Sequence, residues 1–543
     1  MLKYLLFAVA LTIAASFLLI RCANIQAPGG GPKDLKPPQV RKTIPDNETV
    51  NYTGNTVEIQ FNEDINPLSQ ELLITPYYGK KVDVKASKNK IKVTFEQLDT
   101  NTTYTLNFRE QIKDITEKNT LVNYTFTFST GPHLDSLSLK GSIIDLMTNQ
   151  PVTGGFISLY KLNDTSTISK DKPYYLTETD KKGSFTIHNV KGGDYRIYAL
   201  KDANTTINYD NPNDLIDFDT ISLKKNISGL VFKVSRIDTT APKLIHENNI
   251  DENTFLIRFS EGIHQFKILY KDTSFTTLLS DDARDLRIYN NKLLPENDSI
   301  PFSIYASDSL GNADTSKFKI VFEQAKIKKE KHEDTKKEVN KNEQVINKVL
   351  PIDNTFNPDT IDIKIYLVDP WKEINLDSIA LYEDSLPVQL TAKDIIKNKE
   401  LGLFEIKKAN KAKDSVLLYL KKTAFITINN HVLFEQKIKY KIKKVEDIGS
   451  LSGVVNTEEE SYILQLLDSK YTVVQSLKNP KKFQFKYLSP GAYYIRVLID
   501  NNGNGKWDQA SLKDNTKAEP IFFYDEKIDL RANWDIEDTV IKF

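Results

Sequence analysis

The sequence predicts an all-β protein, in which tandem Ig-like β-sandwiches alternate with smaller β modules along an elongated multidomain rod. Two observations lead to this fold class. From Pro37 onward, apolar and polar residues alternate in short stretches that end at Asn, Asp, Gly or Pro, which is the pattern of strands with one buried face. In addition, two different segments recur farther along the chain, and internal repeats indicate an array of similar modules.

The first predicted module covers residues 37–132. Alternating stretches centred on Ile59, Val93, Leu106 and Phe126 follow one another there. Each such strand has an apolar face, and a second sheet must cover these faces to remove them from water. An Ig-like β-sandwich is therefore the expected structure.

A repeat extends this prediction along the chain. The segment VEIQFNEDI from Val57 matches FLIRFSEGI from Phe255, 198 residues later, and a weaker copy begins at Ile361. We therefore predict Ig-like domains over 37–132, 238–325 and 350–444. Glu63 and Glu261 end the matching strands. Because each belongs to a different copy of a structural module, we interpret them as solvated charges rather than as a catalytic pair.

A second repeat defines the smaller modules. The segment KGSFTIHNVKGGDYRIYALKDANTTINYD from Lys182 aligns without a gap to PKKFQFKYLSPGAYYIRVLIDNNGNGKWD from Pro480. It predicts two related β modules over 137–236 and 446–543. Residues 326–348 contain few apolar side chains, and such a segment cannot form a core. We predict that they are a charged linker.

The N-terminus has the layout of a bacterial lipoprotein signal. Lys3 precedes an apolar stretch from Leu5 to Ile20, and Cys22 follows closely. Such signals are cut before the cysteine, whose thiol then carries a lipid, so residues 1–21 are predicted to be the signal peptide. An ordinary secretory peptide and an uncleaved membrane helix remain as alternatives, because Arg21 stands where lipoprotein signals normally have Gly, Ala or Ser.

The composition argues against several classes of function. Cys22 is the single cysteine among 543 residues, so disulfides and zinc–thiolate sites are not expected. The 73 basic and 73 acidic residues balance, which gives no reason to expect nucleic acid as a partner. The six histidines are scattered singly, without the spacing of a zinc site or a catalytic triad. We therefore expect no enzymatic activity.

The stretch from Cys22 to about Phe218 resembles the N-terminal half of a family of Bacteroidota outer-membrane lipoproteins. The matching motifs are Cys22-Ala23-Asn24, Gly30-Gly31-Pro32-Lys33-Asp34, NTTYTLNF from Asn101 and FSTG from Phe128. The resemblance implies a flexible tether over 22–36, then a bacterial Ig-like domain, then a carboxypeptidase-regulatory or transthyretin-like module over 137–236. By the repeat, residues 446–543 would be a second transthyretin-like module. We expect the mature chain to be anchored by lipid in the outer membrane, on the cell surface rather than in the periplasm.

The loop that begins at Asp500 is a candidate calcium site. Side-chain oxygens of Asp500, Asn502, Asn504 and Asp508, together with the backbone carbonyl of Lys506, occur at the spacing of an EF-hand loop, and Ca²⁺ prefers such hard oxygen ligands. However, Ser511 stands where a bidentate Glu is wanted, and a strand rather than a helix precedes the loop. A hairpin turn held by its own Asn and Asp side chains explains the same composition, so both interpretations remain open.

The earlier copy of this loop is a weaker candidate. It keeps Asp202, Asn204 and Asp210 but has Ile207 where the motif needs Gly. Calcium binding is therefore less expected there than at the later loop.

The predicted modules offer a large surface and many sheet edges, without concentrated pocket chemistry. We therefore predict a lipid-anchored, non-enzymatic outer-membrane lipoprotein that acts as a scaffold or accessory subunit of an envelope complex. The expected partner is an integral outer-membrane β-barrel protein of a transport or protein-assembly machinery. The alternative is a glycan-binding surface lipoprotein. A covalent lipid on Cys22 and Ca²⁺ in the later loop are the expected cofactors.

Overall fold

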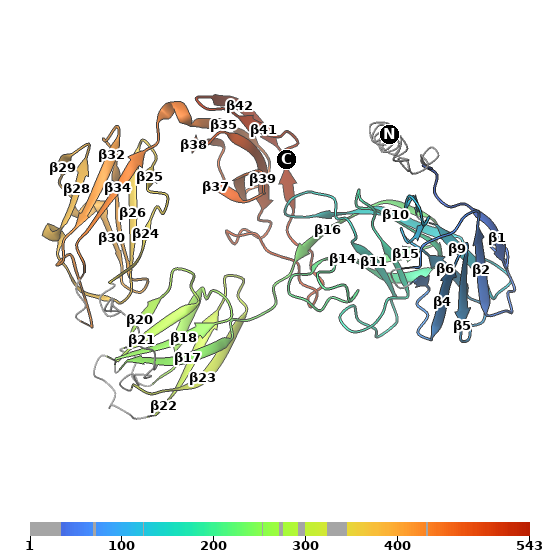
Figure 1. Cartoon of the computed structure of the whole chain (residues 1–543). Helices are drawn as coiled ribbons and strands as arrows, with labels where there is room; N and C mark the ends of the chain where they lie inside the picture. The colour runs from blue at the N-terminus through green and yellow to red at the C-terminus, as the bar shows by residue number, and fades with distance from the viewer. Residues whose placement is uncertain are drawn as a thin grey trace, which may run out of the picture. The chain divides into compact units, whose positions relative to one another are not determined.

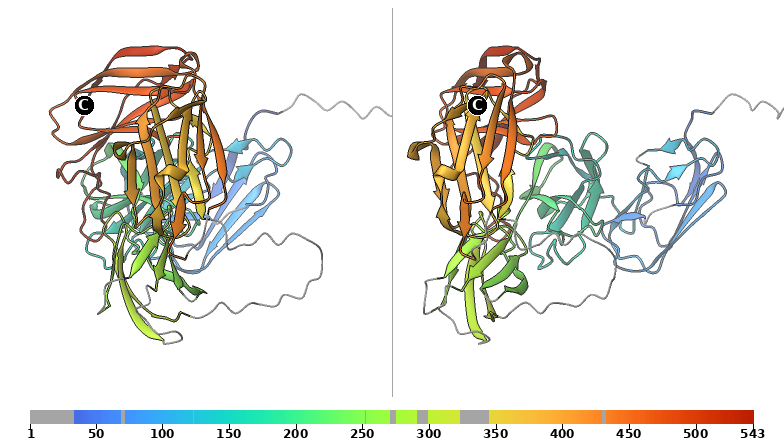
Figure 2. Two further views of the ribbon diagram at one scale, coloured as in Figure 1. Left: turned by 90° about the vertical axis from the view of Figure 1, so that its left-hand side faces the viewer. Right: turned by 60° about the vertical axis from the view of Figure 1, so that its left-hand side comes forward.

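The computed structural model describes residues 34–68, 72–122, 124–251, 253–270, 275–290, 299–322, 345–429 and 433–543 (Figures 1 and 2). In these ranges every long element is a β-strand, and the helices are 3₁₀ helices of three residues each, at Leu376–Ser378, Ala392–Asp394 and Val445–Asp447. The predicted all-β class is thus confirmed. None of the described helices is long and apolar enough to cross a membrane. The elongated arrangement of the modules stays a prediction.

The chain divides into two compact units, which we describe separately. Unit 1 comprises the residues up to Ile143 together with Thr153–Ala199 and Phe218–Val231. Unit 2 comprises Ile144–Val152, Leu200–Asp217 and Phe232–Phe543. The division therefore passes through the first of the two smaller modules.

The first sandwich, residues 34–132, encloses one apolar core between two sheets. One sheet has the order β1-β2-β5-β4 and the other has the order β3-β6-β9. Val57, Ile59 and Phe61 on β2 are fully buried and alternate with more exposed neighbours, as the sequence pattern predicts. The strands are β1 (Val40–Ile44), β2 (Thr56–Phe61), β3 (Leu73–Thr75), β4 (Val82–Ser87), β5 (Lys90–Phe95), β6 (Thr103–Asn107) and β9 (Thr125–Ser129), with the short pair β7 (Ile112–Lys113) and β8 (Thr120–Leu121).

The second sandwich, residues 238–322, repeats this topology. Its sheets have the orders β17-β18-β21-β20 and β19-β22-β23, which correspond strand by strand to those of the first sandwich. Phe255, Ile257 and Phe259 on β18 take the buried places of the matching residues on β2. The strands are β17 (Leu244–Asp251), β18 (Thr254–Phe259), β19 (Gln265–Ile268), β20 (Thr276–Leu279), β21 (Asp285–Tyr289), β22 (Ile300–Ser307) and β23 (Ala313–Ile320).

The third sandwich, residues 345–444, keeps the first sheet and enlarges the second. The orders are β24-β26-β31-β30 and β25-β34-β32-β28-β29, and β27 pairs with β33 separately. The strands are β24 (Ile346–Leu350), β25 (Thr355–Phe356), β26 (Thr360–Leu367), β27 (Trp371–Ile374), β28 (Ile379–Glu383), β29 (Leu386–Val388), β30 (Ile395–Asn398), β31 (Leu403–Ala409), β32 (Ser415–Leu420), β33 (Phe425–Thr427) and β34 (Gln436–Ile442).

The start of this sandwich corrects the predicted linker over 326–348. β24 begins at Ile346, pairs with β26 and buries Ile346, and Val345 before it is also in the core. The segment is charged on average, so its composition does not reveal Val345 and Ile346. These two residues are buried because β24 pairs with β26. The last residues of the predicted linker therefore belong to the sandwich, and residues 326–344 lie outside the described ranges.

The first of the smaller modules, the N-terminal small module of residues 137–236, has one sheet with the order β12-β11-β14-β15-β16-β10-β13. Inside unit 1, β10 pairs antiparallel with β13 and β11 pairs with β12. The strands are β10 (Leu137–Asp145), β11 (Phe156–Lys161), β12 (Tyr175–Glu178), β13 (Ser184–Val190), β14 (Gly193–Lys201), β15 (Leu215–Leu223) and β16 (Ile227–Arg236).

The C-terminal small module, residues 446–543, contains the same strand–turn–strand segment, whose two strands are not neighbours in a sheet in either copy. β38 (Lys482–Leu488) and β39 (Gly491–Ile499) have the bounds of β13 and β14 moved by 298 residues, so the gapless sequence repeat corresponds to one shared element. Its sheets are β38-β35-β42 and β37-β36-β39-β40, with β41 also on β39. The remaining strands are β35 (Gly449–Asn456), β36 (Tyr462–Leu467), β37 (Val473–Lys478), β40 (Ile521–Phe523), β41 (Ile528–Leu530) and β42 (Asp535–Lys542).

A glycine permits close backbone approach inside this module. Gly453 lies on β35, which β42 accompanies in parallel. A Cβ atom added to Gly453 would collide with the backbone carbonyl oxygen of Thr539 on β42. Gly141 on β10 is placed in the same way against the carbonyl oxygen of Leu230. Both copies therefore need a residue without a side chain at this point.

We expect Gly453→Ala to destabilise the C-terminal small module by about 1–3 kcal/mol, the usual cost of overpacking a well-packed interior. The obstacle is backbone, so β42 itself would have to move. Hydrogen exchange followed by mass spectrometry should show faster exchange in β35 and β42. Gly491→Ala is the matched control, because no atom lies within 4 Å of an added Cβ there. Equal exchange in both variants would contradict the close approach.

Candidate functional site

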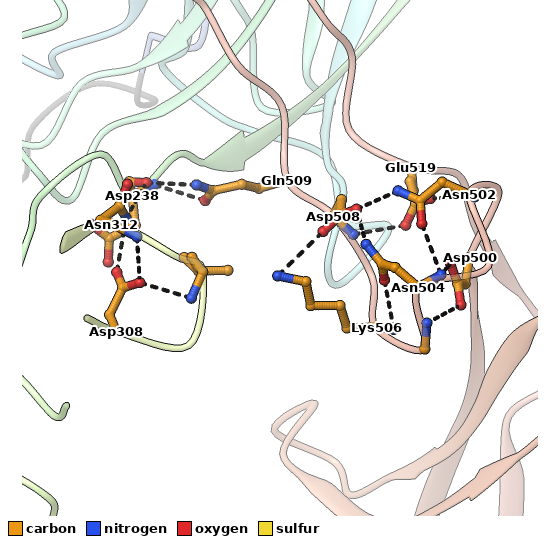
Figure 3. A network of polar contacts seen from close by, with 12 residues as sticks. Asp238, Asp308, Asn312, Asp500, Asn502, Asn504, Lys506, Asp508, Gln509 and Glu519 are labelled. Atoms are coloured by element: carbon orange, nitrogen blue, oxygen red, sulfur yellow. Dashed lines mark hydrogen bonds and ion pairs between the residues drawn. The ribbon is translucent and has the colours of Figure 1, made fainter. Parts of the chain in front are cut away.

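The predicted site residues divide between two parts of the chain. Cys22 and its signal peptide lie outside the described residues. The candidate calcium loop is described completely and follows β39 in the C-terminal small module (Figure 3). The geometry of this loop can therefore be built from its first residue onward.

Asp500 organises the start of the loop. Its side chain is buried, with 4% exposure, and accepts hydrogen bonds from the Ser461 hydroxyl at 2.7 Å and from the Gly505 backbone N–H at 2.8 Å. The Asn504 N–H donates to its other carboxylate oxygen at 3.0 Å. These donors, the Ser461 hydroxyl first, lower the pKa of Asp500 below its usual value, because they stabilise the ionised form. The carboxylate is therefore charged at neutral pH.

The other predicted ligands converge on Asp508. The side-chain amide nitrogens of Asn502 and Asn504 each donate to the same Asp508 carboxylate oxygen at 2.6 Å. The Lys506 ammonium lies 3.8 Å from the second oxygen. The loop thus brings the side chains of Asn502, Asn504 and Lys506 together at the Asp508 carboxylate.

Glu519 closes the loop from the other side, and the sequence analysis did not identify it. Its carboxylate is buried, with 8% exposure, and accepts hydrogen bonds from the backbone N–H groups of Asn501 at 2.8 Å and Asp508 at 2.7 Å. Ser511, at the position where the motif wants Glu, instead donates to Asp514 outside the loop. The second acidic group is present, but it is supplied from just before β40 rather than from the expected spacing.

The earlier copy of the loop has the same construction. Asp202 accepts the N–H of Ile207 at 2.6 Å, and Asn204 donates its amide to Asp210 at 3.0 Å. Asp214 accepts the N–H groups of Ala203 and Asp210, and these positions correspond to Asn501 and Asp508 of the later loop. Asp214 is therefore the counterpart of Glu519.

Ile207 shows why the two loops are not equivalent. It has a φ of +67°, and Gly505, at the matching position, has a φ of +85°. A β-branched side chain is disfavoured in this left-handed region, whereas Gly adopts it freely. The earlier loop therefore has the same turn, but its Ile207 is in an unfavourable backbone conformation, which Gly505 adopts without this cost in the later loop.

The later loop is a hydrogen-bonded turn whose donor set fits calcium. The carboxylates and amides offer oxygen ligands, and half a turn of each Asn amide group would present oxygen in place of nitrogen to the point beside Asp508. Without an ion, the amide nitrogens of Asn502 and Asn504 balance the Asp508 charge. The described geometry is that of the hydrogen-bonded turn, and calcium binding stays a prediction.

A second acidic cluster lies at the beginning of the second sandwich (Figure 3). Asp238, Glu261 and Asp308 each bring one carboxylate oxygen to within 4.8 Å of the others. Thr240 donates its hydroxyl to Asp238 at 2.7 Å. The amide of Asn312 donates both to Asp308, at 2.8 Å, and to the backbone carbonyl of Asp238, at 3.1 Å.

The position of Glu261 corrects the interpretation of this residue as a solvated strand-end charge. It is half-buried, and burial together with Asp238 and Asp308 raises its pKa. The strand end does lie at the sandwich rim, but the chain entering the sandwich folds over it. Sequence alternation locates the strand end without showing what covers it.

The first sandwich contains the corresponding cluster. Burial, Asp114 and Asp34 raise the pKa of Glu63, and the side-chain amide of Asn119 donates to the carbonyl of Asp34 at 3.0 Å. This is the same hydrogen bond that joins the matching residues of the second sandwich. The signal was present in the sequence, because Asp34 and Asp238 each precede a proline by four residues.

The calcium loop and the second acidic cluster are in direct contact within unit 2 (Figure 3). Gln509, the residue after Asp508, accepts the N–H of Asp238 at 2.8 Å and donates to its carbonyl at 2.6 Å. Lys517 also pairs with Asp217 at 2.6 Å. The loop therefore lies against the segment that leads into the second sandwich.

Comparisons with known families match two segments. Residues 34–130 match the bacterial Ig-like domain, which confirms the domain type predicted for the first sandwich. Residues 154–208 match a model described as polysaccharide lyase family 4, domain II, which is an fn3-like domain. No curated protein sequence matches the chain.

Several solved structures are similar at 10–12% identity. The match to the Bacillus anthracis TIE protein covers 95% of this chain and 76% of the TIE chain, with a TM-score of 0.14. BcpA, the major pilin subunit of Bacillus cereus, covers 75% and 98%, with a TM-score of 0.14. SGBP-B of the Bacteroides ovatus mixed-linkage glucan utilization locus, in complex with a heptasaccharide, covers 72% and 95%, with a TM-score of 0.18. With TM-scores this low, these similarities carry no argument.

We expect Glu261→Gln to stabilise the second sandwich at pH 7. A carboxyl whose pKa is raised by folding stabilises the fold below that pKa and loses this contribution as pH rises through it. Gln imitates the protonated form, so the variant should be more stable than the wild type at pH 7, and this gain should shrink toward pH 4. Hydrogen exchange of β18 and β22 at both pH values measures it. Glu247→Gln, on an exposed part of β17, is the control. A gain that is equal at both pH values would refute the assignment.

Proposed function

We propose that this chain is a lipid-anchored, non-enzymatic surface protein of the outer membrane that acts as a scaffold or accessory subunit of an envelope complex. The proposed partner is an integral outer-membrane β-barrel protein of a transport or protein-assembly machinery. The observation that carries the proposal is the array of β modules, in which the three sandwiches and the C-terminal small module each have their own apolar core. Such modules supply an ordered surface with sheet edges for protein partners.

The bacterial Ig-like domain over residues 34–130 supports this proposal. Sites on such folds are grafted onto loops and sheet faces. The acidic side chains described above mainly bind backbone N–H groups of their own loops, which is a structural task rather than acid–base chemistry. We therefore propose that the modules bind or position other molecules without transforming them.

Affinity capture from detergent-solubilised outer membranes tests the proposed function. The tagged full chain should recover one β-barrel protein in a stoichiometric amount, because a scaffold needs a defined partner. The purified chain with Cys22→Ala, added to the same solubilised membranes, controls for material carried along with the lipid. Recovery of the chain alone would refute the scaffold function.

We expect Cys22→Ala to release the chain from membranes or to trap its precursor. Cys22 is the only cysteine, so no other thiol could carry the lipid, and stable membrane binding then has no acyl chain to support it. Metabolic labelling with a radioactive fatty acid, followed by membrane fractionation, measures both effects. Equal labelling of the wild type and the variant would contradict the lipoprotein assignment.

We further propose that the loop from Asp500 to Asp508 binds Ca²⁺. Asp500, Asn502, Asn504 and Asp508 would contribute side-chain oxygens and Lys506 its backbone carbonyl. Support comes from the convergence of these groups and from the charged state of Asp500. The ion would supply a positive centre that holds the loop, and through Gln509 it would also stiffen the contact with Asp238.

We expect the C-terminal small module to melt at a higher temperature in millimolar Ca²⁺ than in chelator. An ion that binds only the folded state stabilises it by about 2.7 kcal/mol at a concentration of 100 Kd. Asp508→Asn should remove the difference, whereas Asp514→Asn, in the turn beside the loop, should keep it. Scanning calorimetry of the full chain measures the transitions. A transition that is independent of Ca²⁺ in the wild type would leave the loop as a hydrogen-bonded turn.

Glycan binding is the second candidate function. It is favoured by one observation, the match of residues 154–208 to a domain of a polysaccharide lyase family. A chain that acts in this way would be retained on a polysaccharide column without a β-barrel partner. The capture experiment above and such a column therefore distinguish the two candidates.

A further inference from the structure

A polar cleft lies between the first sandwich and the N-terminal small module, with all of its lining residues inside unit 1. Its volume is about 560 Å³, within the range of about 300–1,000 Å³ that small-molecule sites occupy. One wall is the turn that joins β6 to β7, and the other is formed by β12, β13 and the turn between them. The cleft is thus a candidate binding site separate from the calcium loop.

The wall from the first sandwich is held by its own backbone. The side-chain oxygen of Asn107 accepts the N–H of Arg109 at 2.8 Å, and the N–H of Gln111 donates to the carbonyl of Phe108 at 3.1 Å. The Phe108 side chain is fully buried in the core of the sandwich. The turn therefore presents Arg109 and Gln111 from a fixed base.

The wall from the small module is equally well supported. Asp180 accepts the N–H groups of Lys182 at 2.8 Å and Ser184 at 2.9 Å, and this closes the turn between β12 and β13. The Thr179 hydroxyl accepts the N–H of Gly155 at 2.9 Å. These bonds fix the hydroxyl-bearing residues of this wall.

Two sets of contacts hold the walls to each other. Arg109 and Glu178 form an ion pair across the cleft, with 3.3 Å between Nε and Oε2. The Asn189 amide donates to the hydroxyls of Thr105 at 3.1 Å and Thr127 at 3.0 Å, on the facing strands β6 and β9. A cleft whose walls are joined in this way is formed before a ligand arrives, so binding costs little reorganisation.

The lining determines what kind of ligand the cleft can take. Six lining residues carry hydroxyl groups, and two carry amides. Charges of opposite sign balance, with Arg109, Lys113 and Lys181 against Glu110, Glu178 and Asp180. Hydroxyls and amides both donate and accept hydrogen bonds, and balanced charge favours neither anions nor cations.

We propose that this cleft binds a neutral oligosaccharide. A saccharide without charged groups is the ligand class that is dense in hydroxyls, each of which can pair with a lining hydroxyl, amide or charged group. Among the described lining residues, Phe185 is the one Phe, Tyr or Trp, and it is 4% exposed. Binding therefore relies on hydrogen bonds rather than on ring stacking. This proposal deepens the second candidate function and is independent of a β-barrel partner.

Isothermal titration calorimetry of the full chain tests the proposal with maltohexaose, cellohexaose, xylohexaose and mannohexaose, and with oligogalacturonate as the charged comparison. We expect saturable binding of at least one neutral hexaose with a Kd below about 1 mM, and weaker binding of the anionic oligomer. No binding by any neutral hexaose, or tighter binding of the oligogalacturonate, would overturn the proposal. Either result leaves the membrane capture experiment unaffected, so the two proposals fail separately.

Two variants locate the binding. Thr153→Trp places a large side chain at the exposed rim of the cleft, and Arg109→Gln removes the guanidinium that bridges the walls. Each should weaken binding at least tenfold. Thr220→Trp, on an exposed position of β15 outside the lining, is the matched control and should bind like the wild type. Unchanged binding in both cleft variants, with wild-type melting curves, would place the saccharide elsewhere and overturn the assignment.

Discussion

The structure depends on the burial of strand faces between paired sheets. Because Cys22 is the only cysteine, no disulfide can hold the modules, and apolar burial has to supply their stability. Each sandwich meets this constraint with strands that alternate along their length, such as β2, where every second residue is buried. The three sandwiches and the C-terminal small module each have a core of their own, and Leu146 packs with Leu498 and Ile521 in a further cluster.

At the ends of the sheets, side-chain carboxylates accept hydrogen bonds from backbone N–H groups of the turns. Turns between strands leave backbone N–H groups without ladder partners, and buried groups of this kind have to be satisfied. Asp114, Asp214, Asp308 and Glu519 each accept two or more such N–H groups. These four acidic residues, none of which the sequence analysis named as a ligand, are therefore first of all loop-closing groups. A cation-binding role is compatible with this task, because oxygen atoms that order a loop are also placed close together.

Contacts between modules hold polar surfaces in fixed positions, and both proposed binding sites lie beside such contacts. In unit 1, the Asn189 amide and the pair of Arg109 with Glu178 fix two modules against each other and leave a polar cleft. In unit 2, Gln509 joins the calcium loop to the segment before the second sandwich. A contact between neighbouring modules thus creates the proposed saccharide cleft, whereas the candidate calcium loop is formed within one module.

The sequence by itself determined the all-β class and the two kinds of repeat, because alternation and turn residues act locally and survive in each copy. It also located the loop from Asp500 to Asp508, whose calcium binding stays a proposal. It could not identify Glu519, which lies at a spacing that differs from that of Asp214 in the earlier copy. Nor could it show that Asp238 covers Glu261, that Ile346 joins a sheet, or that Arg109 faces Glu178. These relations were decided by the tertiary structure, because each depends on which distant strand or turn packs alongside, and a local pattern carries no information about that neighbour.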